Sequence, residues 1–240
     1  EWKQFIDSTN PSMPFDRLSE GLSDKPVILV SDFIPHQKTP AMKAEDNHQE
    51  VESTMEIQLD GSITGEIHLK MTGYPAVTAR NGWRSVTKEQ EKTILEKMFS
   101  SRNQIGSGTM KKDDPQPLLS DFSYSFEFDR PEFIQTKGTG GFYIAPLVSG
   151  PMGVFAYLGY SQEEIEGYST RCGNGSSSER LVYHFPEKMK ILAKPENFEI
   201  NENHLHFKAN YELDGNKLSV VREINDESPA HVCSASLMNK

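Results

Sequence analysis

The chain has 240 residues, of which 35% are hydrophobic, and it carries a formal net charge of −10 at neutral pH with an isoelectric point near 5.2. This length is enough for one large domain or two small ones, each with its own core. Because the lysines are scattered among acids, the chain lacks the concentrated basic patch that nucleic acids and anionic membranes require. No apolar run approaches the ~20 residues of a membrane-spanning helix, and the first ten residues lack the order of a signal peptide.

The first fifty residues are predicted to hold little regular structure. Residues 2–7 alternate apolar and polar side chains as a short strand does, and residues 26–30 form a compact apolar run that predicts a second strand. Residues 36–50 are polar and are the best candidate for a linker.

A β-hairpin is predicted after this stretch. Apolar residues alternate with polar ones on both sides of Asp60-Gly61, at Met55, Ile57 and Leu59 and then at Ile63, Ile67, Leu69 and Met71. A two-residue turn would place the two apolar sets on opposite faces. The parity therefore requires a three-residue loop or a bulge, for which Gly65 is the natural site.

One helix is clear in the sequence, at about residues 87–101. Thr87 and Gln90 have the spacing of a capping box, and an apolar stripe follows at Ile94, Leu95, Met98 and Phe99. Beyond it, residues 122–128 alternate aromatic and polar side chains, which is typical of a half-buried strand. Shorter strands are predicted at residues 132–136, 141–147, 180–185 and 188–193.

A second hairpin is predicted around Asp214-Gly215. With a type I′ turn there, Leu205 pairs with Ile224, Tyr211 pairs with Leu218, and the one mismatch is Phe207 opposite Arg222. Strands at this spacing predict a mainly β fold, either an antiparallel β-sandwich or a large twisted sheet, with one clear α-helix at about residues 87–101.

The second hairpin also carries the one arrangement that suggests a metal. His204 and His206 share a face of their strand, and the predicted register places Glu223 opposite His206. Two imidazoles and a carboxylate form a plausible zinc ligand set. The alternative is a solvent-facing polar strip, because Lys208 lies on the same face and no fourth ligand is evident. We therefore expect no cofactor, with this trio as the metal alternative.

Other motifs favour ordinary structure. The glycine-rich residues 137–141 precede a predicted strand, whereas a phosphate-binding loop precedes a helix. Cys172 lies in a polar loop without apolar support for a catalytic site. Cys172 and Cys233 form no metal pair, and they allow one disulfide or two free thiols. The apolar residues 150–160 lack strand alternation and are read as a buried strand, a short helix or a docking surface.

Several of these features together resemble the C-terminal part of bacterial transglutaminase-like proteins, which are papain-type cysteine proteases in their core. Residues 2–9, with Trp2, Asp7 and Thr9, are similar to the W-x-x-x-D-x-T strand that ends this core, although the spacing here is one residue longer. Residues 59–65 and 73–80 resemble the start of the family's C-terminal domain, and the Asp214-Gly215 hairpin resembles its end.

The resemblance implies a division of the chain and one catalytic remnant. Residues 1–35 would be the tail of a transglutaminase-like core, and residues 51–240 a C-terminal β-rich domain. Asp7 would orient the histidine of a Cys-His-Asp triad, the alternative being an ordinary strand-end aspartate. No position matches the family's cysteine and histidine, so we expect the chain alone to have no hydrolase or acyl-transfer activity.

The function expected from the resemblance is that of a non-catalytic accessory region. It would pack on the upstream transglutaminase-like core of the same polypeptide, or present a protein or peptide substrate to it, in the periplasm or outside the cell. The alternative is a stand-alone β-sandwich module that binds carbohydrate or protein through exposed aromatics, with Tyr157, Tyr160 and Tyr168 as the first candidates.

Overall fold

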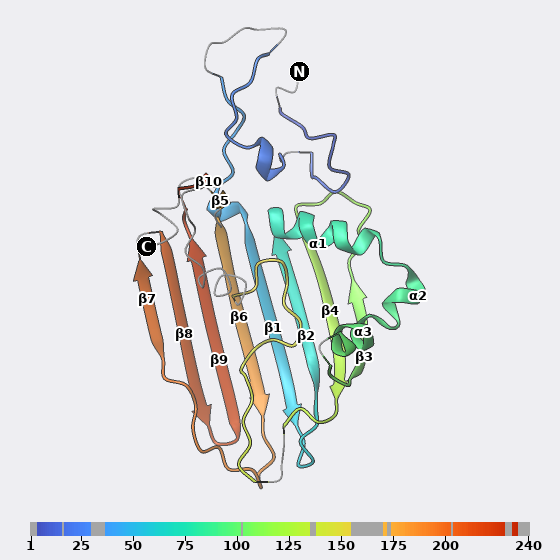
Figure 1. The fold of residues 1–240 in the computed structure, drawn as a ribbon, viewed down its shortest axis with the longest axis vertical. Coiled ribbons are helices and arrows are strands. Elements are labelled where there is room, and N and C mark those ends of the chain that lie inside the picture. Colours follow the sequence, from blue (N-terminus) through green and yellow to red (C-terminus); the bar gives the residue numbers. More distant parts are fainter. Residues whose placement is uncertain are drawn as a thin grey trace.

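The computed structural model describes residues 4–15, 17–29, 37–101, 103–134, 138–154, 170–171, 174–202, 204–228 and 232–234. These residues form one large mixed sheet with helices and irregular segments against one of its faces (Figure 1). The prediction of a mainly β fold is confirmed, and of the two predicted architectures the structure has the large sheet.

The sheet has eight strands in the order β3-β4-β2-β1-β6-β9-β8-β7. Neighbouring strands are antiparallel except β1 and β6, which are parallel. Their bounds are β1 His48–Ile57, β2 Ile63–Thr72, β3 Ser107–Lys112, β4 Asp121–Arg130, β6 Gly175–His184, β7 Phe198–Glu202, β8 Leu205–Asp214 and β9 Lys217–Asp226. Two short strands, β5 Thr170–Arg171 and β10 Val232–Cys233, pair separately.

The described residues contain three α-helices where one was predicted: α1 Tyr74–Arg84, α2 Lys88–Glu91 and α3 Ile94–Ser100. Two 3-10 turns, η1 Glu20–Leu22 and η2 Ala44–Asp46, precede the sheet. The capping box is present at Thr87 and Gln90, but the helix predicted at 87–101 is interrupted at Thr93, whose φ of −116° is not helical. None of the described helices is long and apolar enough to cross a membrane.

The helices cover only part of one face of the sheet. They lie over β2, β4 and β3, and the covering loop, residues 138–154, crosses in front of β1 and β6 (Figure 1). Trp83 of α1 packs edge-on against Tyr124 of β4, with ring centroids 5.2 Å apart. Burial of apolar surface here stabilises the fold by ~25 cal/mol per Å². The core side chains of this face include Val51, Met55, Ile67, Leu69, Phe122, Phe126, Leu181, Tyr183 and Val220.

The opposite face of the sheet, called the open face because no described helix lies over it, carries polar side chains that alternate with the buried residues along most of the strands. Arg180 of β6 lies 3.8 Å from the Glu50 carboxylate of β1, and Lys111 of β3 lies 3.3 Å from the Glu127 carboxylate of β4. The alternation is that of an antiparallel sheet with one solvated face.

The hairpin predicted around Asp60-Gly61 is present, with a longer connection than expected. Ile57 pairs with Ile63, so five residues form the loop and Leu59 is exposed within it. Because the loop has an odd number of residues, the apolar side chains of β1 and β2 lie on the same face of the sheet, which a two-residue turn would not allow. Gly65 pairs regularly with Met55, so the predicted alternative of a bulge at Gly65 is wrong.

The second hairpin is also present, but its register differs from the prediction by two residues. The two-residue turn consists of Gly215 and Asn216, so Leu205 pairs with Asp226 and Tyr211 with Val220. Gly215 has a φ of +56°, the left-handed conformation that such turns require. A shift by two preserves the faces, so the predicted apolar side still meets the core.

Several of the short predicted strands are wrong. Residues 26–29 form only an isolated bridge, from Pro26 to Lys38, and residues 4–7 form no strand. Residues 132–134, 141–147 and 188–193 are turns or irregular segments, because they cover the sheet or connect its strands and do not join it. The predicted strand at 180–185 coincides with β6 up to His184.

Candidate functional site

Asp7 lies in a loop whose hydrogen bonds hold its carboxylate in place. Its Oδ1 accepts hydrogen bonds from the Thr9 backbone N–H at 2.9 Å and from the Thr9 hydroxyl at 2.6 Å, and its Oδ2 accepts one from the Ser19 hydroxyl. The Ser19 and Thr9 hydroxyls hold the pKa of this carboxyl below its usual range, because they stabilise the charged form. Asp7 is thus an ionised and precisely oriented carboxylate, 9% exposed.

The segment that contains Asp7 is attached to the sheet by two arginines of α1. Arg80, 1% exposed, donates to the backbone carbonyls of Ser12 at 3.1 Å, Leu119 at 2.6 Å and Asp121 at 2.8 Å. Arg84 donates to the Pro11 carbonyl of the same segment. A buried cation that is bonded to three carbonyls fixes the chain around it, since each carbonyl would otherwise need another donor.

A pocket of about 430 Å³ lies between this segment and the start of α1. Phe5, Met13, Met42 and Tyr74 give it apolar walls, and Arg17 adds a cation. The Arg17 guanidinium lies 3.7 Å from the Asp46 carboxylate, so its charge is largely matched. Gln4, Lys43, Asp46 and Asn47 also line the pocket, so it is mixed in character, and it sits where the N-terminal segment meets the body.

The three residues of the metal alternative do not come together. His206 pairs with Asn225, and Glu223 pairs with Lys208, because the register is shifted by two from the predicted one. His206 Nε2 instead lies 3.0 Å from the Glu199 carboxylate of β7, and His204 precedes the strand. Among the described residues no group of three or more histidines, cysteines and acids could hold a metal ion.

A buried ion pair on the covered face escaped the sequence reasoning. The Glu179 carboxylate of β6 lies 3.3 Å from the Arg222 guanidinium of β9, and both side chains are almost inaccessible. Arg222 also donates to the Ile144 carbonyl of the covering loop at 2.5 Å and to the Tyr211 hydroxyl at 3.3 Å. The sequence did contain a signal for this buried cation. The predicted hairpin placed Arg222 opposite Phe207, on the face expected to be apolar and buried.

Burial dominates the electrostatics of this pair. Desolvation raises the pKa of the Glu179 carboxyl, and the Arg222 charge offsets only part of that rise. Beside it, Gln49 Nε2 and Ser177 Oγ are buried and have no hydrogen-bond partner among the described residues. The arrangement fastens the covering loop, since Gln49 Oε1 accepts from the Met152 backbone N–H at 3.0 Å and the Tyr183 hydroxyl donates to the Ala145 carbonyl at 3.2 Å.

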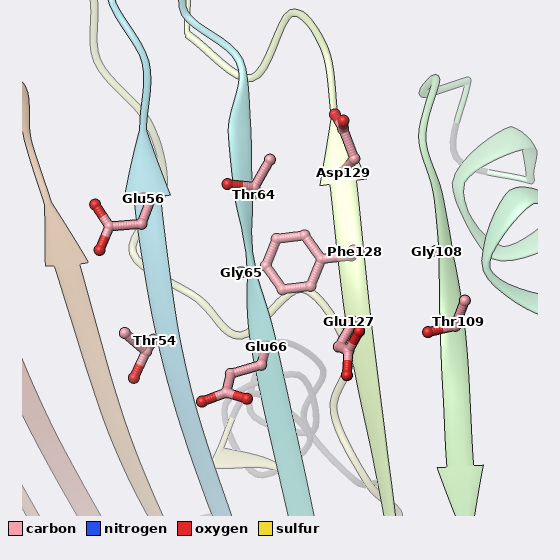
Figure 2. A pocket seen from close by; sticks show the side chains of 10 residues that line it. All are labelled: Thr54, Glu56, Thr64, Gly65, Glu66, Gly108, Thr109, Glu127, Phe128 and Asp129. Atoms are coloured by element: carbon pink, nitrogen blue, oxygen red, sulfur yellow. The ribbon is translucent and has the colours of Figure 1, made fainter.

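The open face has a shallow acidic depression of about 560 Å³. Figure 2 shows the carboxylates of Glu56, Glu66, Glu127 and Asp129 around the backbone of Gly65. Glu66 and Glu127 face each other across β2 and β4, but Glu66 lies 3.3 Å from His68 and Glu127 lies 3.3 Å from Lys111. The Lys111 ammonium moderates the like-charge repulsion, so the depression is a solvated strand surface.

Some predicted residues lie outside the described part of the chain. These are Trp2, Tyr157, Tyr160, Tyr168 and Cys172, while Val154 at the start of the apolar stretch is fully buried. The glycine-rich residues 138–141 are irregular, and the residues that directly follow them, 142–147, are irregular as well.

Comparisons with known proteins give no relatives: no family model matches the chain, and no curated protein or solved structure is significantly similar to it.

Proposed function

We propose that this chain is a non-catalytic accessory region that packs on, or presents protein or peptide substrate to, a transglutaminase-like core preceding it in the same polypeptide. The observation that carries the proposal is the apolar surface of the N-terminal segment, defined as residues 4–29 and 37–47. This segment lies beyond one end of the sheet (Figure 1).

Four large apolar side chains of this segment are exposed. The exposed fractions are 54% for Ile6, 58% for Phe15, 43% for Leu22 and 79% for Ile28. Isolated exposed apolar residues are ordinary, but four in a segment in which Met13 is the one buried large apolar side chain among the described residues favour a surface that another domain covers. The strands predicted at residues 2–7 and 26–30 do not form in the described residues 4–7 and 26–29, where Ile28 is the most exposed of the large apolar side chains.

The attachment of the segment supports a role in positioning. Arg80 and Arg84 bind the carbonyls of Ser12 and Pro11, so a domain bound to the segment would be coupled to the sheet without a free hinge between them. Asp7, ionised and held by Ser19, would then orient a histidine of the preceding core, as the resemblance implies.

The proposal is tested by binding between this chain and the separately expressed region encoded upstream of it, measured by isothermal titration calorimetry. The double variant Ile6→Lys/Ile28→Lys should weaken binding at least about tenfold, because two desolvated charges would face an apolar interface. Leu59→Lys is the matched control, since Leu59 is 51% exposed in the β1–β2 loop. Absence of binding, or equal binding by the double variant, contradicts the proposal.

A further inference from the structure

The edge strand β7 presents apolar side chains at a border of the sheet that no described strand covers. All five residues of β7 are exposed, with Phe198 at 48% and Ile200 at 43%. Within the described residues β7 pairs only with β8, so its outer backbone N–H and C=O groups face away from the sheet. Such an edge is a template for another extended strand.

The opposite edge, β3, is protected in the ways that proteins use against such pairing. Lys111 and Lys112 lie on it, and the Lys112 ammonium is held 3.0 Å from the Glu91 carboxylate of α2. Leu95 of α3 packs so closely over Gly108 that an added Cβ there would lie 2.5 Å from it. β7 has no lysine, and no helix of the described residues covers it, so the two edges differ in how they are protected.

We propose that β7 is a self-association surface, and that a second copy of this chain pairs with it edge to edge about a two-fold axis through Ile200. A two-fold axis perpendicular to the sheet joins antiparallel strands so that equivalent faces continue across the border. The result is a continuous sheet across two copies. This surface is separate from the N-terminal segment, so the inference does not depend on the accessory role.

The charges of β7 favour this register over the one centred on Glu199. With the axis through Ile200, Ile200 meets its own copy, Glu199 meets Asn201, and Phe198 meets Glu202. The register centred on Glu199 would oppose two identical carboxylates, which destabilises a strand pair. In the Ile200 register the Asn201 amide can donate across the border to Glu199, as it already does within β7 at 3.2 Å.

The association should be weak. Only five residues pair, and the area buried falls at the low end of specific interfaces, so a dissociation constant in the micromolar range is expected. Sedimentation velocity of the 240-residue chain over a concentration series measures it, with circular dichroism as the check on folding. The chain should pass from monomer to dimer as its concentration rises.

In the proposed dimer Ile200 lies on the two-fold axis and faces its own copy, so two variants with opposite charges at this residue test the proposal. Ile200→Lys and Ile200→Glu should each weaken dimerisation at least about tenfold, because like charges meet on the axis. An equimolar mixture of the two should associate again, since lysine then meets glutamate. Leu59→Lys, at the 51% exposed Leu59 of the β1–β2 loop, is the control and should dimerise as the unmodified chain does.

Three results would overturn the proposal. The first is a chain that stays monomeric at every concentration, as it would if β7 paired only with an extended peptide. The second is dimerisation of Ile200→Lys with unchanged affinity. The third is failure of the mixed lysine and glutamate variants, both folded, to associate.

Discussion

Glu179 and Arg222 form an ion pair inside the molecule, with 3.3 Å between Oε2 and Nη1 and side-chain exposures of 0% and 6%. The pair joins β6 to β9, and Arg222 extends the link to the covering loop through Ile144. It therefore fastens an irregular segment to the sheet at a position where apolar packing alone would not specify the conformation of the loop.

Removal of the cation should destabilise the protein strongly. Arg222→Ala leaves the Glu179 carboxylate buried without its partner, and the expected loss is about 3–5 kcal/mol in the free energy of unfolding. Urea denaturation measures it. Arg180→Ala is the control, because the Arg180 side chain is 52% exposed and its carboxylate partners lie at 3.8 and 4.0 Å, so it should cost less than about 1 kcal/mol. Equal losses in the two variants would contradict the role of Arg222.

Glu179 should also set a pH dependence. Its folded-state pKa is raised above the ordinary value of 4.5, so the folded state retains a proton that the unfolded state has released. Stability from this group is therefore complete below 4.5 and declines as the pH rises through the folded-state pKa. Glu179→Gln should abolish that decline. The free energy of unfolding of the unmodified protein minus that of the variant should therefore fall as the pH rises above 4.5. A difference that does not change with pH in this range would refute the shift.

Gly65 and Gly82 should respond oppositely to alanine. A Cβ on Gly65 would lie 2.3 Å from the Thr54 carbonyl and 3.0 Å from the Phe128 ring, which covers the glycine. Gly65→Ala should therefore destabilise the protein by about 1–3 kcal/mol. Gly82 in α1 has nothing within 4 Å, and Gly82→Ala should stabilise it by about 0.5–1 kcal/mol. Thermal unfolding of both variants tests this, and a tolerated alanine at residue 65 would mean that β1 and β2 separate easily.

Arg80 should govern the opening of the N-terminal segment. Arg80→Met removes all three carbonyl hydrogen bonds, including the one to Ser12. Loss of even one charged hydrogen bond, worth about 1.5 kcal/mol or more, should raise proteolytic cleavage in residues 4–29 at least about tenfold. Lys88→Met, at an exposed residue of α2, should leave cleavage unchanged. Unaltered cleavage in Arg80→Met would show that the arginine does not hold the segment.

The sequence predicted elements best where one local pattern sufficed. The alternation at residues 122–128 and both hairpins carried strand signals that the structure confirms, and the capping box at Thr87 is present. In contrast, α1 was missed because Val77, Thr78, Asn81 and Gly82 are poor helix formers. Its start depends on Asn47, whose Oδ1 accepts from the Tyr74 backbone N–H at 2.9 Å across 27 residues, and no local pattern contains such a cap.

The candidate sites were harder to predict, because they depend on register and long-range contacts. A shift of two residues in the β8–β9 hairpin separated His206 from Glu223, and the pairing of β7 with β8 places His206 next to Glu199. The Glu179–Arg222 pair spans 43 residues, and Arg80 reaches Ser12 across 68. Such contacts follow from the order of strands in the sheet, which the short apolar patterns do not specify.

The accessory role is tested most directly by hydrogen–deuterium exchange on the longer polypeptide that includes the upstream region, compared with this chain alone. The account predicts that backbone amides around Ile6 and Ile28 exchange at least about tenfold more slowly in the longer polypeptide, since a neighbouring domain would cover these exposed side chains. Amides of the β1–β2 loop around Leu59 should exchange equally in both. Equal exchange at Ile6 and Ile28 in the two proteins would contradict the account.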